Sequence, residues 1–126
     1  MLLRLDQSET ALLLAHMAMT RKSARNTFKR NHKNEKKELL QSFDEVKDCL
    51  EEVIENTNEE VRDQVNNFHF NVREVKMIHS FLSSYIPLLS ETIKKAGAKE
   101  GDKEQIKALE KIKEYSHKLL EGASVV

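Results

Sequence analysis

A short pattern occurs twice in the chain, and it indicates where two helices begin. Residues 3–9 read apolar, polar, apolar, and then a short polar residue that is followed three positions later by glutamate. Residues 68–74 repeat this order 65 positions further on. In each copy the short residue, Asp6 or Asn71, can accept a hydrogen bond from the helix backbone, while the glutamate reaches back to the cap's own amide. The pattern therefore predicts two extended segments, each followed directly by a capped helix.

The likeness between the two parts of the chain extends beyond these caps. Apolar positions of residues 40–54 coincide with apolar positions of residues 106–120 at an offset of 66 residues. Any two amphipathic helices can be aligned in this way, so the repeated caps carry more of the argument. We interpret the chain as one domain, residues 1–126, whose halves 1–66 and 67–126 share a strand–helix–helix plan.

Helical periodicity predicts four amphipathic helices. The first starts near Gln7 and becomes strongly polar after Thr20. The second has the clearest pattern, because its apolar residues recur at alternating steps of four and three, as in a heptad seam. The third covers Val72 to about Lys95 and is apolar on more than one side, and the fourth begins at Asp102, which is expected to cap it. The seam of the second helix consists of Leu39, Phe43, Val46, Leu50, Val53 and Thr57.

Together these segments predict a mainly α-helical fold that resembles a four-helix bundle. The chain has 3 Gly and 1 Pro, too few for the many tight turns of an all-β protein. The extended segments 3–5 and 68–70 are expected to pair as an antiparallel ribbon whose apolar side chains cover the core. Asn66 and Asn67 are expected to form a turn before the second strand.

Charge is balanced overall but segregated along the chain. Lys and Arg number 21, as do Asp and Glu. Positions 21–37 hold eight bases and one acid, whereas positions 44–63 hold nine acids and two bases. These stretches are either solvated helix faces that attract each other across a hairpin, or a basic and an acidic docking surface. The candidates are Arg21, Lys22, Arg25, Lys29, Arg30 and Lys33 for the basic patch, and Asp44, Asp48, Glu51, Glu52 and Glu55 for the acidic patch.

Two other binding modes fit the same sequence. Clustered cations suit phosphate contacts, although Phe28 is the one aromatic residue in the stretch 21–37 and no nucleic-acid-binding motif is visible. The wide apolar surface of the third helix suits a partner protein or a second copy of the chain. The candidates for that interface are Met77, Phe81, Tyr85 and Leu88. A nucleic-acid-associated regulator and a homodimer are therefore the alternatives.

Catalytic and metal-binding motifs are missing from the sequence. None of the five histidines forms a recognised metal-ligand pair, and there is neither a glycine-rich phosphate loop nor a nucleophile elbow. Cys49 lies between acidic residues, which disfavour a reactive thiolate. We therefore expect no enzymatic activity, no cofactor and no metal.

The remaining features of the sequence concern its location and its general character. One cysteine excludes an intrachain disulfide, and we see neither a signal peptide nor an apolar run of membrane-spanning length, so the expected location is the cytoplasm of the producing cell or its host. The short, charged chain is similar in style to small accessory proteins of Gram-positive bacteria and their phages, a likeness that assigns no residue roles. The leading hypothesis is a helical adaptor, regulator or inhibitor that binds another protein.

Overall fold

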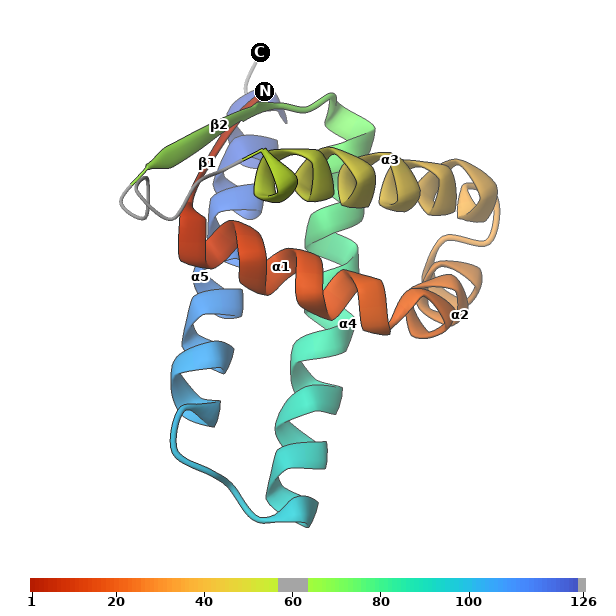
Figure 1. The fold of residues 1–126 in the computed structure, drawn as a ribbon. Coiled ribbons are helices and arrows are strands. Elements are labelled where there is room, and N and C mark those ends of the chain that lie inside the picture. The colour runs from red at the N-terminus through yellow and green to blue at the C-terminus, as the bar shows by residue number, and fades with distance from the viewer. Residues whose placement is uncertain (57–63, 125–126) are drawn as a thin grey trace.

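Two of the helices begin at Gln7 and Val72, where the repeated pattern places them, whereas the second strand begins at Val65, three residues earlier than predicted. A computed structural model describes residues 1–56 and 64–124, which form a two-stranded sheet and five helices (Figure 1). The elements in chain order are β1 (Leu2–Asp6), α1 (Gln7–Met19), α2 (Arg21–Asn31), α3 (Lys36–Glu55), β2 (Val65–His69), α4 (Val72–Ala96) and α5 (Asp102–Ser124). The prediction of a mainly α-helical, bundle-like fold is confirmed.

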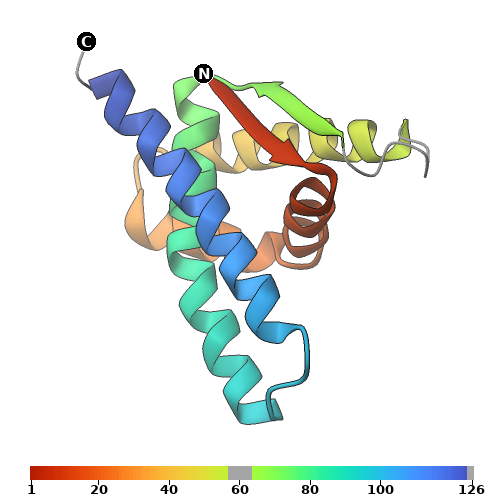
Figure 2. The ribbon, with the colours of Figure 1, turned by 90° about the vertical axis from the view of Figure 1, so that its left-hand side faces the viewer.

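The helices are arranged as a long hairpin that is crossed by shorter elements. Helices α4 and α5 run side by side in opposite directions, and α1 and α3 lie across them (Figure 1). A view from the side shows the β1–β2 ribbon near one end of this hairpin, while its other end extends beyond the remaining helices (Figure 2). Helix α4 therefore occupies a central position, with α2, α3 and α5 all packed against it.

An aromatic cluster joins three of these helices. The ring of Phe43 from α3 meets Phe28 of α2 edge-on at a centroid distance of 6.5 Å, and Phe81 of α4 at 5.5 Å. All three side chains are buried, as are Leu39, Val46 and Leu50 of the predicted α3 seam. Val53 is half-buried against the core, and Thr57 lies outside the described residues. The phase predicted for the described part of this helix is therefore confirmed.

The ribbon pairs in the predicted direction and covers the core. Leu3 lies opposite Phe68, and the apolar side chains predicted to cover the core, Leu3, Leu5, Phe68 and Phe70, are buried. One further pair extends it, because the Met1 ammonium donates to the carbonyl of Phe70 at 2.7 Å and the Phe70 N–H donates back at 2.9 Å. The ribbon depends on the helices beneath it, since an isolated two-stranded sheet is marginally stable in water.

Both predicted capping boxes are present. The N–H of Glu9 donates to Oδ1 of Asp6 at 2.7 Å, and the Asp6 N–H donates to Oε1 of Glu9 at 3.0 Å. The corresponding distances at Asn71 and Glu74 are 2.8 and 2.9 Å. Each box satisfies amides that would otherwise lack a partner at the helix start, so the alternating segment ends at a defined residue.

The two halves share their plan except at one break. Helix α4 has 25 residues, and residues 65 positions earlier form α1 and α2, which Thr20 separates. Helices α3 and α5 begin 66 positions apart. The equivalent residues Leu3 and Phe68 face each other in the antiparallel ribbon, which is the arrangement that a local two-fold axis produces.

The break at Thr20 corrects the prediction of four helices. Residues after Thr20 were expected to be the polar end of the first helix, but they form the separate helix α2. Its buried side consists of Ala24, Thr27 and Phe28, a narrow stripe with i, i+3, i+4 spacing. Met19, which directly precedes the break, is exposed.

Two smaller predictions are also wrong. Asn66 and Asn67 lie inside β2 rather than in a turn, because the Asn66 amide donates to Gln7 Oε1 at 2.9 Å and to Thr10 Oγ1 at 3.1 Å. Asp102 is the first residue of α5 and not its cap, and its carboxylate accepts from the N–H of Lys99 at 2.7 Å.

Candidate functional site

The basic patch lies on the outer side of α2. Its cations are exposed, whereas Ala24, Thr27 and Phe28 on the opposite side of the helix are buried. Phe28 anchors the helix to the core, and the loop that follows is held to α4 by a 2.6 Å ion pair between Lys76 Nζ and Glu35 Oε2. Apart from Arg21, the exposed cations of α2 and this loop are Lys22, Arg25, Lys29, Arg30 and Lys33, and we call these five the basic face.

One bidentate ion pair connects the two charged stretches. Arg21 donates from Nε and Nη2 to the two carboxylate oxygens of Asp44 at 2.8 and 2.9 Å. This hydrogen bonding holds the pKa of Asp44 below its ordinary value. Arg21 of the predicted basic patch and Asp44 of the predicted acidic patch therefore pair with each other. Among described residues, no carboxylate lies within 4.0 Å of any basic-face cation.

The remaining acidic residues lie at the other end of α3 from α2 (Figure 1). We call them the acidic face; they are Asp48, Glu51, Glu52 and Glu55, all exposed. The last turn of α3 contains no basic residue, so these carboxylates stand at the negative end of the helix dipole. Helix α4 has the opposite and favourable order, with Glu74 in its first turn and Lys94 and Lys95 in its last. Helix stability therefore does not account for the acidic face.

The predicted apolar interface on α4 is mostly core. Met77 and Phe81 are 0% and 1% exposed, and Tyr85 is half-buried with its ring stacked on Phe81 at 5.1 Å. Only Leu88 of this set is exposed, at 49%. The prediction that Met77 and Phe81 form a partner surface is wrong. Helix α4 has apolar residues on several sides because other helices of the same chain pack against those sides.

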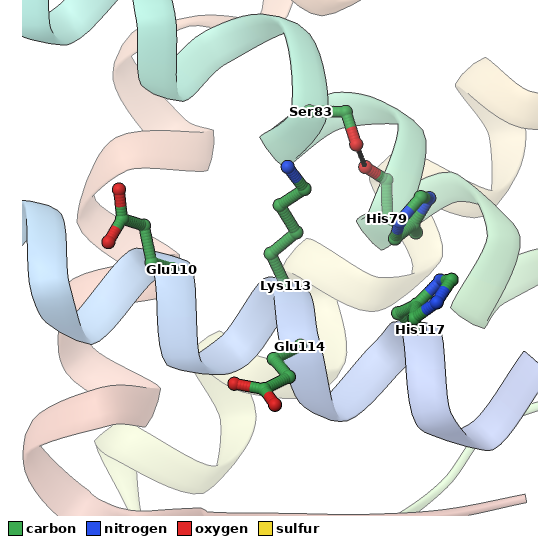
Figure 3. Close-up of a pocket in the computed structure, with 6 residues that line it drawn as sticks. All are labelled: His79, Ser83, Glu110, Lys113, Glu114 and His117. Carbon is green, nitrogen blue, oxygen red and sulfur yellow. Dashed lines mark hydrogen bonds between the residues drawn. The ribbon is translucent and has the colours of Figure 1, made fainter.

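A cleft of about 490 Å³ lies between α4 and α5, and sequence reasoning missed it. His79 of α4 and His117 of α5 stack across the two helices with ring centroids 5.4 Å apart (Figure 3). Lys113 extends from α5 towards α4, and Glu110 lies on α5 on the side of Lys113 away from the histidines (Figure 3). Only the register of the two helices brings these residues together, so no local spacing could have revealed them.

The hydrogen bonds in this cleft are structural in character. Ser83 donates from Oγ to the backbone carbonyl of His79 at 2.7 Å, and Nε2 of His117 lies 2.8 Å from Oε1 of Glu121. The serine proton is thus directed at the backbone and not at an imidazole that could remove it. Across residues 1–56 and 64–124, no group of three or more His, Cys, Asp or Glu side chains is arranged to hold a metal ion.

The environment of His79 makes folding sensitive to acid. Burial, followed by the charges of His117 and Lys113, lowers the pKa of His79 from its ordinary value of 6.5. The unfolded chain then takes up a proton at a higher pH than the folded protein does. The stabilisation from neutral His79 is therefore fully present above about pH 6.5 and is lost as the pH falls below it.

This sign gives a testable expectation for the melting temperature. Between pH 7.5 and 5.5, the melting temperature of His79→Gln should fall less than that of the parent, because Gln fills similar space and does not titrate. His69→Gln, on the exposed side of β2, is the matched control and should follow the parent. Identical pH profiles for the parent and His79→Gln would contradict the assignment.

Cys49 offers no reactive thiol. Its side chain is half-buried on α3, and burial, with smaller contributions from Glu52 and Glu74, raises the pKa of the thiol. A raised pKa leaves little nucleophilic thiolate at neutral pH. The packing of Cys49 against the core supports the interpretation of this residue as a small apolar side chain.

None of the described helices combines the length and the apolar character needed to cross a membrane.

Comparisons with known proteins add no family or neighbour to these observations. Searches of protein-family models, of curated proteins and of solved structures gave no significant match.

Proposed function

We propose that this is a non-enzymatic protein-binding module whose basic face docks an acidic segment of a partner protein. The observation that carries the proposal is a set of exposed cations without a described carboxylate within 4.0 Å, on a helix fixed to the core through Phe28. A helix that is packed on the core favours binding, because its backbone loses little conformational freedom when the partner docks. The protein would act as an adaptor, regulator or inhibitor through this contact.

The arrangement of α2 favours a protein partner over a nucleic acid. Proteins that bind single strands stack bases on exposed aromatic residues, and Phe28, the one aromatic residue of the stretch 21–37, is buried. Helix α2 has 11 residues and is about 16 Å long, so it spans few phosphates. Nucleic-acid binding through the same cations is the second candidate, and the clustering of five exposed cations within residues 22–33 is the observation that favours it.

Charge reversal on the basic face should separate binding from folding. In the triple variant Arg25→Glu, Lys29→Glu, Lys33→Glu, the helical signal and melting temperature should remain near those of the parent, because all three side chains are exposed. The affinity for an acidic partner should fall about tenfold or more. The partner is first identified by cross-linking in producer cells, and its dissociation constant is then measured with purified proteins.

A second triple variant provides the control. Lys99→Glu, Lys103→Glu, Lys107→Glu makes the same change in net charge on exposed residues at and after the α4–α5 loop, away from α2 (Figure 1). It should bind like the parent. Equal loss in both variants would show a non-specific charge effect. Tight binding of the parent to a DNA or RNA fragment that falls steeply between about 50 and 200 mM salt would favour the second candidate instead.

A further inference from the structure

The ribbon has an edge that points away from β1. Phe70 exchanges both backbone hydrogen bonds with Met1, and alternate residues of an antiparallel strand bond to the same neighbour. Asn66 and Phe68 therefore bond to β1, whereas Val65, Asn67 and His69 direct their N–H and C=O groups to the outer edge of β2. No hydrogen bond joins these outward groups to another described residue.

The sequence of β2 does little to block this edge. Natural sheets protect exposed edges with Lys, Pro or inward-pointing charges. Strand β2 reads Val-Asn-Asn-Phe-His and contains none of these, whereas β1 carries Arg4 on its exposed side. Val65 adds an apolar side chain that is 51% exposed. The edge thus offers both backbone groups and an apolar contact to an incoming strand.

The acidic face borders the same edge. A groove of about 460 Å³ separates β2 from the last turns of α3 and is lined by Glu52, Val53 and Asn56 on one side and by residues 64–68 on the other. Glu52 is the member of the acidic face that lines the groove, and Glu51 and Glu55 lie on the same turns of α3, where the negative end of the helix dipole adds to their potential. A strand seated here would meet the Glu52 carboxylate on its α3 side, with the other carboxylates of the acidic face on the same helix.

From this geometry we infer that the outer edge of β2 is a second docking surface, which takes an extended, Lys- or Arg-rich segment of a partner protein by β-strand addition. Backbone hydrogen bonds to the outward groups of Val65 and Asn67 supply affinity, and the acidic face selects basic side chains. This surface is distinct from the basic face of α2. Loss of binding at one surface therefore leaves the other testable.

The probe is a short synthetic peptide in which Lys and Val alternate, compared with the same peptide containing Glu in place of Lys. The Lys peptide should bind about tenfold more tightly than the Glu peptide in fluorescence anisotropy at low salt. Hydrogen exchange should slow at the amides of Val65 and Asn67 on binding. The amides of Asn66 and Phe68, already bonded to β1, should change little.

Asn67→Pro is the sharpest variant. Proline removes an N–H that faces the outer edge and leaves the β1–β2 bonds intact, so the ribbon should persist while peptide affinity falls about tenfold. Protection of the Phe68 amide and the melting temperature report whether the variant folds. If it does not fold, the exchange pattern of the parent with the Lys peptide decides the question.

Charge variants separate selection from strand addition. The double variant Glu52→Lys, Glu55→Lys should lose the preference for the Lys peptide, whereas Glu104→Lys, Glu110→Lys on α5 should keep it. Equal affinity for both peptides, or unchanged exchange at Asn67, would overturn the inference. Dimerisation of the protein alone with protection of Asn67 would also overturn it, because a second copy would then occupy the edge.

Discussion

Replacing Phe43 by alanine is expected to lower the free energy of unfolding by about 3–5 kcal/mol, and Leu50→Ala by about 2–5 kcal/mol. Both side chains are 0% exposed, and the ring of Phe43 contacts Phe28 and Phe81, so its removal leaves a cavity where three helices meet. The loss is a large fraction of the roughly 5–15 kcal/mol that stabilises a typical domain. Equilibrium denaturation by urea or guanidinium measures it directly.

The matched controls lie on the outer side of the same helix. Asp48→Ala and Glu55→Ala remove exposed carboxylates and should each change stability by about 0.5 kcal/mol or less. If the inner and outer substitutions were equally costly, the packing phase of α3 would be wrong.

Phe28→Ala is expected to release α2 as well as to cost about 3–5 kcal/mol. Helix α2 has 11 residues, which is too few for a stable helix in water without packing, and Phe28 is the largest of its three buried side chains. Hydrogen exchange of α2 amides should therefore accelerate more than exchange in α4 or α5. The reversal of Arg25 and Lys29 on the outer side of the same helix, together with Lys33 in the loop after it, should leave this exchange near the parent level. Uniform acceleration in Phe28→Ala would show that α2 opens only with the whole fold.

Local sequence chemistry predicted the helix starts and the ribbon. A capping box acts within four residues, and alternation assigns side chains to two faces without reference to distant parts of the chain. The pairs Asp6–Glu9 and Asn71–Glu74 were therefore readable, as was the burial of Leu3 and Phe68.

The missed features depend on contacts between distant residues. Asparagine is typical of turns, but the side-chain amide of Asn66 donates hydrogen bonds to Gln7 and Thr10, which are 59 and 56 positions away in the sequence. Helix α2 was missed because its buried stripe has only three members, one of them the polar Thr27. No periodicity in a single segment reports either feature.

The candidate site was predicted in its charges but not in its geometry. The segregation of basic and acidic residues is visible in the sequence, whereas the Arg21–Asp44 pair requires α2 and α3 to be placed side by side. The stacking of His79 on His117 requires the register of α4 and α5 in the same way. The sequence could not predict which face of α4 is exposed, because the exposed face depends on how many other helices pack against α4.

The pairing of Leu3 with Phe68 has a consequence for synthesis on the ribosome. The partner of β1 is made 65 residues later, which at about 5–20 residues per second takes roughly 3 to 13 seconds. During that interval the nascent chain presents Leu3 and Leu5 on an unpaired segment, and α1 has no ribbon above it. The first strand to be translated therefore stays unpaired during this interval. Its apolar side chains are then accessible to chaperones and to neighbouring chains on a polysome.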